Sequence, residues 1–143
     1  MNYRAVIIML LFYMVSCRSQ QQFYQKYDGI KLAVGTSGGF TGEEKKFVLL
    51  DNGNLYKISS LSHDTVFVAK LENAKSKQIF NNYNVLGLGK MNISEPGNMN
   101  YFIEYKNGDI SHKLLWSNSL QKGSEVHLFY DFFMEIVRSL TNN

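Results

Sequence analysis

Cysteine and proline are nearly absent from this chain of 143 residues, where each occurs once, as Cys17 and Pro96. A single cysteine cannot form a disulfide within the chain, so the folded protein must be held together by its hydrophobic core. Long apolar runs are missing too, because the longest, residues 5–15, is shorter than the roughly 20 residues that a membrane-spanning helix needs. These absences exclude a disulfide-stapled scaffold and argue against a spanning helix.

Strong charge and recognisable catalytic motifs are also absent. The formal net charge is only +3 and the lysines are scattered, which argues against nucleic-acid binding. The three histidines, His63, His112 and His127, lack metal-ligand spacing such as H-x-x-x-H, so we expect no metal site and no cofactor. No G-x-S-x-G elbow occurs, and the remaining catalytic candidates are His112 and the adjacent pair His63 and Asp64.

The N-terminal residues follow the order of a secretory signal peptide. A short segment with Arg4 precedes the apolar residues 5–15, and a small residue stands before Cys17. The stretch "MVSC" resembles the lipobox of bacterial lipoproteins, although that family prefers leucine where this chain has Met14. In that family the cysteine becomes the first mature residue and its sulfur receives a diacylglycerol. The resemblance implies lipid attachment at Cys17; the alternative is an ordinary cleaved signal with a cysteine by chance.

These features divide the chain into three parts. We predict a signal peptide over residues 1–16, a lipidated N-terminus and polar tether over residues 17–27, and one globular domain over residues 28–143. Through the lipid on Cys17, the exported protein is expected to be anchored in the bacterial cell envelope, facing the periplasm or in the outer membrane. Two or more acyl chains hold a protein stably, because each buried CH₂ contributes about 0.8 kcal/mol.

Turn signals and alternating apolar residues predict a β-meander followed by a helix. Residues 30–71 contain four alternating runs, and the second and third flank Asn52-Gly53, a hairpin signal that favours positive φ at both turn positions. In residues 72–83 the period of two is lost, and apolar residues recur at helical spacing.

The C-terminal part predicts a second hairpin, around Asn107-Gly108, and a longer helix. Ser124 is a suitable N-cap, and the apolar stripe that follows is centred on Phe133 and widened by Leu128. The predicted fold class is therefore α+β. It has an antiparallel sheet of about six strands, in the order ββββ-α-ββ-α, with two helices packed on one face.

Two glycine-containing stretches are unusual. "TSGGFTG", residues 36–42, is longer than hairpin geometry needs and surrounds Phe40 with glycines. It is either a wide hairpin or a contact loop in which Phe40 is the anchor, and the candidate partner-binding residues are Gly38, Gly39, Phe40, Thr41 and Gly42. "SEPGNMNYF", residues 94–102, predicts a type II turn with Pro96 at i+1 and Gly97 at i+2.

These stretches carry two resemblances. "GGFTG", "LLDNGNLYK", "PGNMNYF" and a strand that ends in Trp116 together resemble a family of small uncharacterised bacterial lipoproteins, which carries no assigned activity. The segment Thr36 to Gly42 alone is similar to the emfourin-like inhibitors of thermolysin-type metalloproteases, in which the polypeptide blocks the cleft of an enzyme. This chain is longer than those inhibitors. The second resemblance implies a contact role for Gly38 to Gly42 and nothing more.

The sequence thus favours a membrane-anchored envelope lipoprotein that acts as a non-catalytic protein-binding module. Its expected partners are the membrane, through Cys17, and an envelope protein or a protease, through the glycine-rich loop. Two alternatives remain open. One is a hydrolase that acts on envelope material through His112 or through His63 and Asp64, and the other is a purely structural envelope component.

Overall fold

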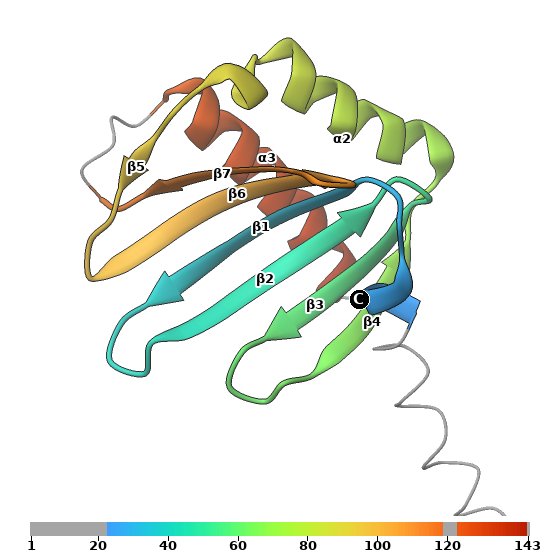
Figure 1. Ribbon diagram of the computed structural model, residues 1–143. Coiled ribbons are helices and arrows are strands. Elements are labelled where there is room, and N and C mark those ends of the chain that lie inside the picture. The colour runs from blue at the N-terminus through green and yellow to red at the C-terminus, as the bar shows by residue number, and fades with distance from the viewer. Residues whose placement is uncertain (1–22, 119–122, 143) are drawn as a thin grey trace, which may run out of the picture.

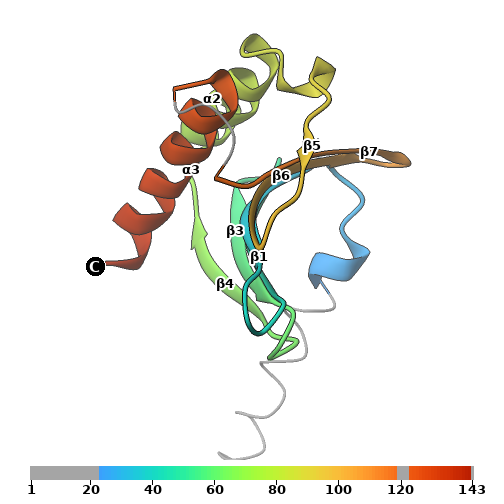
Figure 2. The same ribbon diagram turned by 90° about the vertical axis from the view of Figure 1, so that its left-hand side faces the viewer.

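The computed structural model describes residues 23–118 and 123–142 (Figure 1). In these residues the architecture is α+β, with seven strands in one sheet of order β4-β3-β2-β1-β6-β7-β5. Figure 2 shows helices α2 and α3 on one side of the sheet and residues 23–30 on the other. The predicted signal peptide and Cys17 lie outside the described residues. No helix in the described part of the chain has the length and apolar character needed to cross a membrane.

The order of elements extends the predicted ββββ-α-ββ-α pattern. One helical turn, residues 23–26, comes first. The elements that follow are β1 (Lys31–Gly38), β2 (Glu43–Leu50), β3 (Asn54–Ser59), β4 (Thr65–Lys70), α2 (Asn73–Val85), the 3-10 helix η1 (Leu88–Lys90), β5 (Ser94–Glu95), β6 (Met99–Asn107), β7 (Ile110–Trp116) and α3 (Glu125–Thr141).

The sheet is mixed, so the prediction of a purely antiparallel sheet of about six strands is wrong in detail. The first four strands form the expected antiparallel meander, and β6 pairs antiparallel with both β1 and β7. The short strand β5 pairs with β7 in parallel, with Ser94 opposite Leu115 and Glu95 opposite Trp116. A strand of two exposed residues has no alternating apolar pattern, which explains why periodicity did not indicate it.

The main core lies between the sheet and the two helices. Leu32 and Val34 of the central strand β1 point to this side and are fully buried. Trp116 is 1% exposed, and Phe133 is 2% exposed, as its place at the centre of the apolar stripe predicted. Leu128 is 56% exposed, however, so it does not widen the buried stripe of α3. The buried side chains of that helix are Val126, Phe129, Tyr130, Phe133, Ile136 and Val137.

The β2–β3 hairpin forms where it was predicted, but with a different turn. The N–H of Gly53 donates to the carbonyl of Leu50 at 2.9 Å, and Gly53 has a φ of 89°, whereas Asn52 does not have positive φ. The loop therefore has three residues, Asp51 to Gly53, in the arrangement of a type I turn followed by a left-handed glycine. The expectation of positive φ at both positions of Asn52-Gly53 is wrong. Because the chain reverses over three residues, Asp51 to Gly53, only Gly53 has positive φ.

Replacement of the glycine in this turn should destabilise the domain. A Cβ at Gly53 would lie 2.8 Å from the carbonyl oxygen of Leu71, in a backbone conformation that L-residues disfavour by about 1–2 kcal/mol. Gly108 is a matched control, because its φ is +57° but a Cβ there would meet nothing within 4 Å. We expect urea unfolding to show a larger loss for Gly53→Ala than for Gly108→Ala. Equal losses would contradict the close packing of this turn against Leu71.

The face of the sheet opposite the helices carries a smaller cluster. Ala33, Val48, Leu50 and Tyr56 are buried there, and Tyr24 and Tyr27 pack against them. The Tyr27 hydroxyl donates to the Asp51 carboxylate, and the ring of Tyr24 lies 6.0 Å from that of Tyr56. Residues 23–27, which the sequence pattern placed in the tether, therefore contact the sheet.

Candidate functional site

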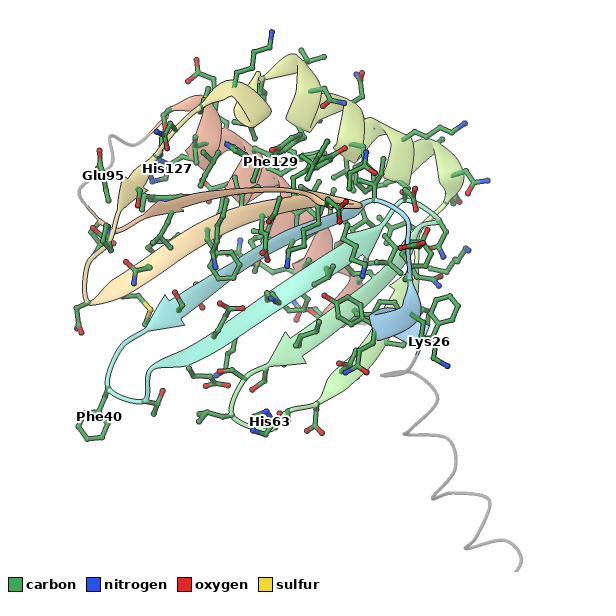
Figure 3. All side chains as sticks on the ribbon, in the orientation of Figure 1. Lys26, Phe40, His63, Glu95, His127 and Phe129 are labelled. Atoms are coloured by element: carbon green, nitrogen blue, oxygen red, sulfur yellow. The ribbon has the colours of Figure 1, made fainter. Side chains whose placement is uncertain are left out.

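The glycine-rich stretch forms the loop between β1 and β2. Gly38 pairs with Glu43, so residues 39–42 make the connection. The φ values of Gly38, Gly39 and Gly42 are 102°, 72° and 63°, a region of backbone space that glycine adopts without steric cost. Phe40 stands at the tip and points away from the sheet (Figure 3), and its side chain is completely exposed, at 107% of the reference value.

Hydrogen bonds brace this loop against the connection between β5 and β6. The N–H of Gly39 donates to the carbonyl of Asn98 at 2.7 Å, and the N–H of Gly42 donates to the carbonyl of Gly39 at 3.2 Å. The N–H of Gly97 in turn donates to Oδ1 of Asn100, on β6, at 2.6 Å. The glycine-rich loop is therefore tied through neighbouring backbone to a strand of the sheet.

The type II turn predicted for Glu95 to Asn98 is not formed. Glu95 ends β5, and Gly97 is not among the described glycines with positive φ, which a type II turn requires at this position. A Cβ at Gly97 would lie only 2.7 Å from Cβ of Ser117. Glycine is therefore needed here for close approach of two chain segments rather than for a tight turn.

Met99 is a member of this region that the sequence did not indicate. It is 42% exposed, and its Cε would lie 3.3 Å from a Cβ placed on Gly39. Met99 thus covers one side of the loop whose tip carries Phe40. The sequence pattern did not indicate Met99 because the connection before it, residues 96–98, starts from β5, a strand that periodicity did not predict.

The candidate catalytic histidine His112 is half-buried, and both of its ring nitrogens lie within hydrogen-bond distance of other residues. Its Nε2 lies 2.8 Å from the carbonyl oxygen of Met91, which only accepts, so Nε2 donates. Its Nδ1 lies 3.1 Å from the hydroxyl of Tyr83, within hydrogen-bond distance. Burial raises the pKa of Tyr83 to about 12, so this hydroxyl keeps its proton at neutral pH. These contacts join β7 to α2 and to the segment after η1.

The other histidines lie far apart in the fold. His63, with a φ of 54°, is in the exposed β3–β4 loop, and no hydrogen bond or ion pair between described residues joins its side chain to that of Asp64. His127 lies in the first turn of α3, and its Nδ1 is 3.1 Å from Oγ of Ser124. Ser124 is the predicted N-cap, but its hydroxyl contacts this imidazole instead of a backbone N–H. In the described ranges no group of three or more His, Cys, Asp or Glu could hold a metal ion.

No known family model matches the chain, and no curated protein is similar to it.

Proposed function

We propose that the chain is a membrane-anchored envelope lipoprotein whose domain is a non-catalytic protein-binding module. Residues Gly38 to Gly42 form its contact loop, and Phe40 is the anchor. The observation that carries the proposal is the complete exposure of Phe40 on a loop braced by hydrogen bonds.

An exposed aromatic ring does nothing for folding, because it buries no apolar surface. On contact with a partner, a phenylalanine can bury roughly 150–250 Å². The bracing of Gly39 by Asn98 restrains the loop before binding, so less conformational entropy is lost when a partner binds. Anchors of this kind, set in the middle of a small contact surface, supply most of the free energy in many interfaces.

The alternatives have weaker support. A hydrolase based on His112 is disfavoured by the two hydrogen bonds that occupy its ring nitrogens. His63 and Asp64 are exposed, and no side-chain contact between them indicates a catalytic pair. A purely structural envelope component would not require the exposed ring of Phe40.

Site-specific crosslinking tests the module. A photoreactive phenylalanine analogue at position 40 should crosslink the protein to one envelope partner in producing cells. The same analogue at position 110 is the control, because Ile110 is also exposed, at 65%, but lies at the opposite end of the sheet. An identical crosslinking pattern at both positions would contradict a specific contact loop.

A narrower form of the proposal names a protease as the partner. It is supported by the similarity of Thr36 to Gly42 to the emfourin-like inhibitors. Under this form, the purified domain slows peptide cleavage by a thermolysin-type metalloprotease, and Phe40→Ala relieves the inhibition. Lack of inhibition by the unaltered domain would exclude this form and leave the general module in place.

The predicted lipid anchor has its own test. Cys17→Ser removes the sulfur that would carry the diacylglycerol, so we expect the variant to remain unprocessed or to become soluble. Detergent phase partitioning and intact mass of the variant measure the effect. If the variant still partitions wholly into detergent and has the mature mass of the unaltered protein, the prediction of a lipid on Cys17 is wrong.

A further inference from the structure

The open face, which is the side of the sheet opposite α2 and α3, carries an excess of positive charge (Figure 2). On strands β1, β2, β6 and β7, its charged side chains are four lysines and two glutamates: Lys31, Lys46, Lys106, Lys113, Glu44 and Glu104. The side chain of Glu104 is only 14% exposed, against 50% for Lys106 and 38% for Lys113. The outermost charge on this face is therefore positive.

Several of these cations gather where the chain enters the domain. Lys26 is exposed in the N-terminal helical turn, and Nζ of Lys31 lies 3.4 Å from the carbonyl oxygen of Tyr24 in the same turn. Lys31 is also the cross-strand partner of Lys106. Burial and the nearby ammonium of Lys106 lower the pKa of Lys31, against a smaller opposing effect of Asp28. The two ammonium groups thus repel each other, and an anion beside them would relieve that repulsion.

The predicted lipid anchor is attached close to these cations. Phe23, the first described residue, follows Cys17 by six positions in the sequence. A fully extended chain of this length spans roughly 22 Å at most, whereas a domain of this size is about 30–35 Å across. The turn that contains Phe23 lies on the open-face side of the sheet (Figure 2), so a short tether holds that side near the bilayer.

We propose that the open face rests on the anionic headgroups of the membrane to which the protein is anchored, with Lys26, Lys31, Lys106 and Lys113 as its contacts. This inference rests on the proposed lipid at Cys17. Each lysine near an anionic bilayer strengthens the attraction about fivefold, and a basic surface is a membrane signal that adds to acyl chains. In this orientation α2 and α3 lie on the side away from the bilayer, where a partner can reach the domain.

Vesicle sedimentation tests this contact without the lipid. The mature chain with Cys17→Ser is mixed with vesicles of phosphatidylcholine, either alone or with an equal part of phosphatidylglycerol. We expect the anionic vesicles to bind the chain more tightly, and added salt to weaken that binding because it screens the charges. Equal binding to both kinds of vesicle would overturn the proposal. Because this chain carries no lipid, the result is independent of whether Cys17 is lipidated in cells.

Two pairs of substitutions separate the open face from the net charge of the chain. Lys26→Gln combined with Lys106→Gln removes two charges from the open-face side and should weaken binding to anionic vesicles roughly thirtyfold, about fivefold for each lysine. Lys75→Gln combined with Lys77→Gln is the matched control, because it removes the same charge from exposed residues of α2 on the other side of the sheet. The control pair should weaken binding much less. Equal losses for the two pairs would contradict a specific role of the open face.

An environment-sensitive fluorescent label shows which side meets the membrane. With Cys17→Ser the chain has no other cysteine, so Ser111→Cys places one thiol on the open face, opposite Lys106, and Leu128→Cys places one on the exposed side of α3. Anionic vesicles should shift the emission of the label at position 111 to the blue and leave that at position 128 unchanged. A larger shift at position 128 would place the helices against the bilayer and overturn the proposal. A shift at position 111 that grows with protein concentration without vesicles would assign the open face to a second copy of the chain instead.

Discussion

Phe133→Ala is expected to lower the free energy of unfolding by about 3–5 kcal/mol, the usual range for truncation of a buried aromatic ring. Phe133 is 2% exposed and lies midway along α3. Its ring centroid is 6.4 Å from that of Phe129, and it belongs to the same cluster as Leu49 and Leu55 of the sheet. Alanine would leave a cavity between helix and sheet that neither rigid layer can close.

Urea unfolding measures this loss, and Leu128→Ala on the same helix is its control. Leu128 is 56% exposed, so its truncation should change stability by no more than about 0.5 kcal/mol. Similar small losses for both variants would place the Phe133 side of α3 away from the sheet, which would contradict the packing described above.

Phe40→Ala is expected to reverse that pattern, with a large loss of binding and a small change in stability. Because the ring is fully exposed, its removal should change the free energy of unfolding by no more than about 0.5 kcal/mol. Loss of an interface anchor costs about 2 kcal/mol or more, which corresponds to a roughly thirtyfold weaker affinity for the partner.

The matched control for Phe40→Ala is Ile110→Ala. Ile110 is also an exposed apolar residue beside a hairpin turn, but that turn lies at the other end of the sheet. Its truncation should change neither stability nor affinity. If Ile110→Ala weakens binding as much as Phe40→Ala does, general surface hydrophobicity accounts for the interaction and the loop has no special role.

Local patterns predicted most of the fold because their causes are local. Both Asn-Gly hairpins formed at the expected places, and the stripe of α3 buried Phe133 as its spacing required. The details that failed depend on contacts between distant segments. Strand β5 exists only through its pairing with β7, and Gly97 is shaped by its approach to Ser117.

The alternation of apolar residues along a strand also predicts burial wrongly where the adjacent strand carries a glycine. Phe102 lies on the face opposite the helices, where a simple two-period reading places solvent, but it is fully buried. Its ring lies against Gly35 of β1, where any Cβ would come within 2.8 Å of it. The ammonium of Lys113 covers the ring at 4.1 Å from its centroid. Only the pairing of β6 with both β1 and β7 brings these residues together.

The candidate site also has features that the sequence predicted and features that it did not. Glycine spacing indicated a loop with Phe40 at its centre, because three of its residues need backbone conformations that glycine adopts freely. The bracing by Asn98 and the adjacent Met99 could not be predicted, since both follow the unpredicted strand β5.

The most direct test of the contact loop compares Phe40→Ala with the unaltered domain in two assays on the same preparations. Thermal unfolding measures stability, and titration calorimetry measures the dissociation constant for the partner identified by crosslinking at position 40. We predict equal melting temperatures and a roughly thirtyfold weaker affinity for the variant. A destabilised variant that binds the partner with unchanged affinity would show that Phe40 serves the fold, and would contradict the account.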